Sequence, residues 1–75
     1  MEEISKIILK GENFLKDGNY QEALSCFEQA IILKPNDPDL WNSKALALRS
    51  IGRYEEAIEC FNKSLEIDPT DKTAS

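Results

Sequence analysis

The feature of this 75-residue chain that most constrains its fold is an internal repeat with a period of 34 residues. When each residue from Ile4 to Asp37 is compared with the residue 34 positions later, nine pairs are identical. Two unrelated segments of this length and of average composition would share about two identical pairs. The identical pairs are Lys10/Lys44, Gly18/Gly52, Tyr20/Tyr54, Glu22/Glu56, Ala23/Ala57, Cys26/Cys60, Phe27/Phe61, Pro35/Pro69 and Asp37/Asp71. A chain with this period is expected to form two copies of one unit, each burying its apolar face against the next.

Each copy contains two stretches in which apolar residues recur at intervals of three and four, as they do along one face of a helix. In the first copy these stretches are 4–15 and 23–31, and Gly18 lies between them. Gly52 divides the second copy in the same way. The spacing predicts four helices, near residues 2–17, 20–34, 38–51 and 54–67.

The residues at the expected helix ends agree with this division. Gly18 and Gly52 each follow a helix, where the chain commonly adopts a left-handed conformation that glycine enters without penalty. Asp37 is expected to cap the third helix, and Pro38 to occupy its first position. Valine is absent from the chain, which further favours helix over strand. We therefore predict an all-α fold of two helix-turn-helix units with four antiparallel helices.

Charge and composition exclude several function classes. The net charge of −5 has the wrong sign for binding phosphate backbones, so we expect no nucleic-acid partner. No apolar run is long enough to span a membrane, and the first residues are acidic where a signal peptide would be basic, so we expect a cytoplasmic protein. Histidine is absent, and Cys26 and Cys60 occupy equivalent positions one repeat apart, too distant for a disulfide. We expect no catalytic residue, metal or cofactor, and no enzyme activity.

The repeated residues resemble the tetratricopeptide repeat, which has a 34-residue period and the pattern W-x2-L-G-x2-Y, then A-x3-F, then P. The second copy matches through Trp41, Leu48, Gly52, Tyr54, Ala57, Phe61 and Pro69. The first copy matches through Gly11, Phe14, Gly18, Tyr20, Ala23, Phe27, Ala30 and Pro35. The chain departs from the pattern at Lys10 and Lys44, where the family usually has leucine.

The resemblance implies a single domain over residues 1–75, with repeat one at 4–37 and repeat two at 38–71. The implied architecture is a short right-handed α-solenoid, in which small residues of one helix meet large residues of its neighbour. The aromatic residues, Tyr20 and Tyr54 included, are expected to fill the spaces between helices.

The resemblance also implies a function. Proteins of this kind bind an extended peptide or a helix of a partner protein in a concave groove lined by the first helix of each repeat. Matching positions predict a groove formed by Ser5, Ile8, Glu12, Leu15, Asp39, Asn42, Leu46 and Arg49.

The alternative is a structural role, in which the chain associates with itself through the apolar side of the last helix. The residues expected there are Ile58, Phe61 and Leu65, because no following repeat covers them.

Asp71 repeats the capping position of Asp37, so residues 72–75 are expected to begin an incomplete third helix pair or a cap. On this interpretation the chain is a fragment of a longer repeat array that starts at or near Met1.

Overall fold

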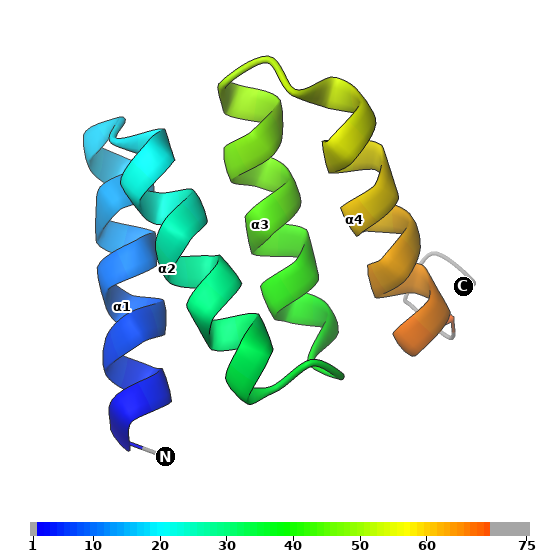
Figure 1. Ribbon diagram of the computed structural model, residues 1–75, viewed down its shortest axis with the longest axis horizontal. Coiled ribbons are helices and arrows are strands. Elements are labelled where there is room, and N and C mark those ends of the chain that lie inside the picture. Colours follow the sequence, from blue (N-terminus) through cyan, green and yellow to red (C-terminus); the bar gives the residue numbers. More distant parts are fainter. Residues whose placement is uncertain (1, 70–75) are drawn as a thin grey trace.

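The computed structural model describes residues 2–69, and these form four α-helices joined by short turns (Figure 1). The helices are α1 (Glu2–Asp17), α2 (Tyr20–Leu33), α3 (Pro38–Ser50) and α4 (Tyr54–Ile67). The sequence-based bounds are confirmed to within one residue. The second and third helices end one residue early, because Lys34 and Ile51 have left the helical conformation. The Asp71 cap and the segment 72–75 lie outside the described residues.

The ends of the helices follow the local chemistry that the sequence predicts. Gly18 and Gly52 have φ angles of 82° and 87°, in the left-handed region where a side chain would be strained. The Asp37 carboxylate accepts a hydrogen bond from the Asp39 amide at 3.0 Å, and Pro38 occupies the first position of α3. Two glycine turns and one capped turn therefore set where the helices stop and start.

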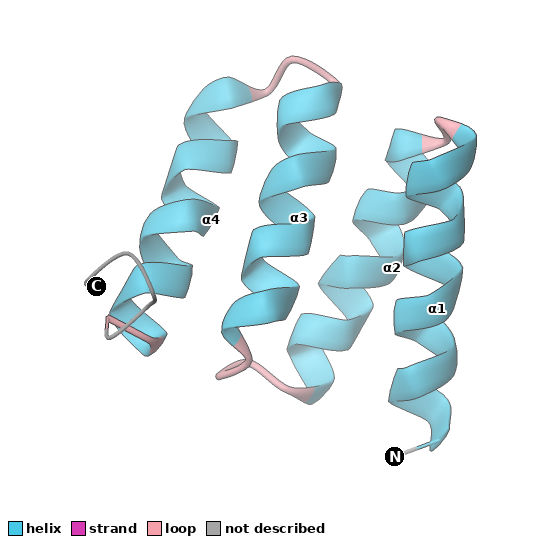
Figure 2. Cartoon of the chain, turned by 180° about the vertical axis from the view of Figure 1, so that it is seen from behind, coloured by secondary structure: helices cyan, strands magenta, loops and turns pink. Residues whose placement is uncertain are grey.

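The helices pack in the order of the sequence. The pairs in contact are α1 with α2, α2 with α3, and α3 with α4, and neighbouring helices run antiparallel (Figures 1 and 2). Any other pair within residues 2–69 makes no more than marginal contact. The result is the all-α, helical-hairpin solenoid expected from the repeat, with α2 and α3 each covered on two sides.

The core consists of large side chains set against small ones. Phe27 and Leu48 are almost completely buried, at 0% and 1% exposure, within a cluster that includes Ala23, Ala45 and Ala57. A second cluster joins Ile4, Ala30, Ile31 and Leu40 near the start of α1. Gly11 shows how close the packing is, because a Cβ placed there would lie 2.9 Å from two atoms of the Phe27 ring.

Two expectations about packing were wrong. Tyr54 does not fill a space between helices; it is 62% exposed, because no described helix covers that side of α4. Its counterpart Tyr20 is half-buried on α2, which α3 does cover. The apolar spacing expected for the third helix, Trp41, Ala45, Leu48 and Ile51, leaves out Leu40 and Ala47. Both are nevertheless buried, because α3 packs against α2 as well as α4.

Candidate interaction surfaces

The eight residues predicted to line a groove lie on α1 and α3, which make at most marginal contact with each other. Ile8 and Leu15 are half-buried, because they pack against the two core clusters. The remaining six are exposed: Ser5, Glu12, Asp39, Asn42, Leu46 and Arg49. The structure therefore presents them as two separate rows of side chains, one on each helix.

The row on α3 has a distinct chemistry. Leu46 is 39% exposed, and Asn42 and Arg49 lie four residues before it and three residues after it. This spacing places all three side chains on one face of the helix. The face combines an apolar contact with an amide that can donate and accept hydrogen bonds and with a guanidinium group that can pair with a carboxylate.

A cavity of about 280 Å³ lies elsewhere, between α2, α3 and α4. The lining residues that matter here are Glu28, Trp41, Lys44, Arg53, Glu56 and Cys60. None of the eight predicted groove residues lines it. One sequence feature pointed to this cavity. Lys44, which lines it, stands at a position where the tetratricopeptide pattern usually has leucine.

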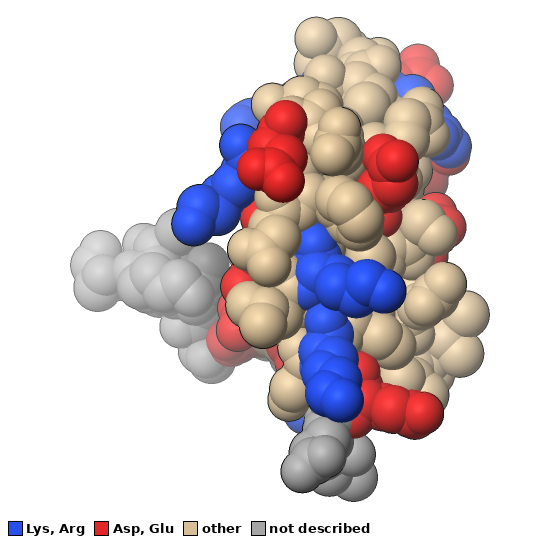
Figure 3. Space-filling model, turned by 90° about the vertical axis from the view of Figure 1, so that its left-hand side faces the viewer, with Lys and Arg blue, Asp and Glu red and all other residues tan. Residues whose placement is uncertain are grey.

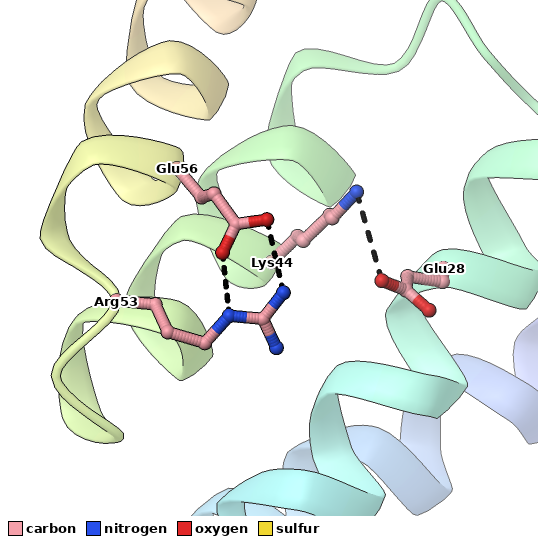
Figure 4. Close-up of polar contacts among 4 residues, drawn as sticks. All are labelled: Glu28, Lys44, Arg53 and Glu56. Atoms are coloured by element: carbon pink, nitrogen blue, oxygen red, sulfur yellow. Dashed lines mark hydrogen bonds and ion pairs between the residues drawn. The ribbon is translucent and has the colours of Figure 1, made fainter.

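Charged side chains of opposite sign are paired around this cavity (Figure 4). The Lys44 ammonium lies 3.8 Å from the Glu28 carboxylate and 5.5 Å from the centre of the Trp41 ring. Arg53 donates two hydrogen bonds to Glu56, from Nε to Oε1 and from Nη2 to Oε2, the second at 2.9 Å. The hydrogen bonds from Arg53 lower the pKa of Glu56, and Glu56 in turn raises the pKa of Arg53.

Cys60, on the wall of the cavity, is a packing group. It is 5% exposed, and burial raises the pKa of its thiol. The thiol is therefore protonated at neutral pH, which removes the reactivity of a thiolate. Both cysteines are free, and Cys26 is half-buried. Across residues 2–69, no three side chains of His, Cys, Asp or Glu come together as a metal site requires.

The outer side of α4 carries a third surface, made of exposed apolar residues. Tyr54, Ile58 and Leu65 are 62%, 57% and 47% exposed. Their spacing of four and seven residues places them along one face of the helix, and we call them the α4 stripe. Half-buried Phe61 borders it.

The equivalent residues of α2 are covered. Leu24 and Ile31, which correspond to Ile58 and Leu65, are only 5% and 8% exposed. Because α3 packs on α2 and no described helix packs on the far side of α4, the same surface is buried in one repeat and open in the other.

Two further findings bear on what kind of protein this is. None of the helices within residues 2–69 is long and apolar enough to cross a membrane. When the sequence is compared with protein families, residues 8–72 match the tetratricopeptide repeat. The matched segment spans most of both copies and contains the three surfaces described above, apart from Ser5.

Proposed function

Because the chain belongs to the tetratricopeptide repeat family, whose repeats mediate protein–protein interactions, we propose that it binds a peptide or helix of a partner protein along α1 and α3. The repeat units would be residues 4–37 and 38–71. The family consists of non-catalytic modules, which agrees with a binding role. The observation that carries the proposal is the exposed Leu46, flanked by Asn42 and Arg49 on a face of α3 that is not used for core packing.

The chemistry of these two rows indicates what the partner segment should offer. Leu46 would contact an apolar side chain, and the exposed Arg49 would pair with an acidic one. The Asn42 amide would bind the peptide backbone, which offers both donors and acceptors. On α1, Ser5 and Glu12 would add polar contacts beside the half-buried Ile8 and Leu15. The expected ligand is therefore an extended or helical segment with an apolar anchor next to a carboxylate.

Selection from a displayed peptide library, with the whole chain immobilised, tests this proposal. Selected peptides should lose at least tenfold in affinity for the double variant Asn42→Ala, Leu46→Glu, because the anchor contact is replaced by a charge. The matched control is Ile32→Gln on α2, where the native side chain is 77% exposed and lies outside the proposed rows. Peptides that bind the double variant as tightly as the native chain would refute this location.

Self-association through Ile58, Phe61 and Leu65 is the second candidate function. The exposure of Ile58 and Leu65 favours it, because unburied apolar residues in a row commonly mark an interaction site. Sedimentation velocity over a hundredfold range of concentration tests it. A monomer throughout the range would remove this candidate, whereas a dimer that disappears in Ile58→Gln would support it.

A further inference from the structure

We propose that two basic residues at the carboxyl ends of α1 and α3, Lys16 and Arg49, set the direction of the bound peptide. The occupant is an extended peptide that lies along α3, with its acidic end at Lys16 and Arg49 and its basic end at Asp39. This inference rests on the proposed function, because it names the ligand and its direction on the same two helices. It is carried by the separation of charge along these helices and by the small apolar area between the charges.

Lys16 and Arg49 lie at the same end of the two helices. Each is in the last turn of its helix, and α1 and α3 run in the same direction (Figures 1 and 2). In the repeat, Lys16 corresponds to Ser50, the residue after Arg49, so the two side chains belong to the same helical turn of their units. At about 100° per residue, Lys16 lies about 40° around α1 from Glu12, and Arg49 lies about 60° around α3 from Leu46. Both cations therefore border the face of the proposed site.

The charge of these two cations is available to a ligand. Both side chains are exposed, and no ion pair within residues 2–69 includes either of them. Asp17 follows Lys16, but it lies about 100° further around α1, away from Glu12. Glu12, one turn before Lys16, would repel a carboxylate from the middle of α1. Figure 3 shows a contrast on the adjoining side of the molecule, where α1 faces the viewer and acidic and basic side chains are interspersed.

The other end of the same face is acidic. Asp39 is exposed in the first turn of α3, and no ion pair within residues 2–69 includes it. The turn before it, residues 34–37, carries one charge of each sign, on Lys34 and Asp37, so Asp39 makes this end net negative. Arg49 follows Asp39 by ten residues, which is about 15 Å along the helix. Because this exceeds the screening length of about 8 Å in physiological salt, each end acts on a ligand separately.

The apolar part of the face favours an extended peptide over a helix. A docked helix needs apolar contacts at several turns, whereas the row on α3 offers one exposed apolar residue, Leu46. An extended peptide needs fewer such contacts, because the Asn42 amide can pair with its backbone. At about 3.3 Å per residue, the distance from Asp39 to Arg49 corresponds to about five residues of an extended peptide. The ligand is therefore a segment whose basic and acidic side chains are about five residues apart, with an apolar residue between them and nearer the acidic end.

Paramagnetic broadening in NMR spectra of the full chain tests the direction. The probe is a synthetic peptide with blocked ends, made of two aspartates, a leucine, two serines and two lysines in that order, together with a second peptide of reversed sequence. A nitroxide on the aspartate end should broaden the amide signals of Gly18 and Gly52, in the turns after α1 and α3. A nitroxide on the lysine end should broaden those of Asn36 and Asp39. Both peptides should behave in this way, because charge and not backbone direction decides the orientation. A reversed peptide with its lysine end at the two glycines, or equal broadening at both ends, would overturn the inference.

Variants separate this inference from the proposed function. Lys16→Glu should weaken the binding of both peptides about three- to tenfold, and added salt should reduce the difference. The matched control is Lys10→Glu, which makes the same change in net charge on an exposed residue about 160° around α1 from Glu12, and it should change the affinity by less than about twofold. Equal affinity of Lys16→Glu and the native chain, or no binding of either peptide, would overturn the inference. The proposed function would still stand if peptides selected from the library lose affinity for the double variant Asn42→Ala, Leu46→Glu.

Discussion

Replacing Phe27 with alanine should destabilise the protein more than the same replacement at Phe61, although the two residues are equivalent in the repeat. Phe27 is 0% exposed, and its ring lies against the backbone of Gly11. Phe61 is only half-buried, because no described helix covers the outer side of α4. The difference between the two variants therefore measures what a covering helix contributes.

The expected magnitudes follow from burial. Truncation of a fully buried phenylalanine costs about 3–5 kcal/mol, because the apolar contacts are lost and a cavity remains. Phe61 is partly rather than fully buried and packs against the edge of the core cluster, so its truncation removes fewer contacts and we expect a smaller loss, about 2–3 kcal/mol. A chain of this length has a free energy of unfolding of about 4–11 kcal/mol. Phe27→Ala should therefore remove a large part of the total stability, whereas Phe61→Ala should leave the protein folded.

Urea denaturation measures both losses, with helix content followed by circular dichroism. The fluorescence of Trp41, the single tryptophan, provides a second probe. The milder changes Phe27→Leu and Phe61→Leu keep the comparison measurable when Phe27→Ala is too unstable to fold. Equal losses at the two positions, or a larger loss at Phe61, would refute the reasoning, because they would show that burial by a neighbouring helix does not determine the cost.

Three further predictions concern packing, capping and charge. Gly11→Ala should lower the melting temperature. The new Cβ would clash with the Phe27 ring at a cost of about 1–3 kcal/mol in stability, which outweighs the gain of about 1 kcal/mol from the higher helix propensity of alanine. A higher melting temperature would show that the Phe27 ring moves aside. Asp37→Ala should reduce the free energy of unfolding by about 1 kcal/mol, because the start of α3 loses its cap, and an unchanged urea midpoint would contradict this. Arg53→Gln should raise the pKa of Glu56 in an NMR titration, because the hydrogen bonds that lower it are removed. Since the folded-state pKa of Glu56 is lowered, its contribution to the free energy of unfolding is present above the ordinary pKa of about 4.5 and is lost as the pH falls through the folded-state pKa. An unchanged Glu56 titration midpoint in the Arg53→Gln variant would exclude the pairing of Arg53 with Glu56.

The helices could be predicted from the sequence because the signals for them are local. Gly18, Gly52 and Asp37 act on their own turns, and the apolar spacing acts within one helix, so the bounds follow without knowledge of the packing. The order of contacts between helices follows in turn from the repeat, because each unit buries its apolar face on the next.

The environment of single residues could not be predicted in this way. Tyr20 and Tyr54 are the same residue at the same repeat position, yet the second is 62% exposed, because its environment depends on whether another helix lies beside it. Lys44 departs visibly from the repeat pattern, but only the structure shows that it reaches from α3 to Glu28 on α2 and lines a cavity. Contacts between helices depend on side-chain directions in three dimensions, which spacing along one helix does not contain.

The outer sides of the first and last helices, α1 and α4, differ in chemistry, because α1 presents polar residues there and α4 presents apolar ones. This difference affects how such a protein can lengthen by gene duplication. A further copy of residues 38–67 joined after α4 would meet Ile58 and Leu65, which already resemble the surface that α3 covers on α2. A copy inserted before α1 would have to bury Lys6 and Asn13, and unpaired burial of a charge and an amide is costly. Duplication can therefore lengthen the solenoid from its carboxyl end without compensating substitutions, whereas growth from the amino end requires new residues on α1 first.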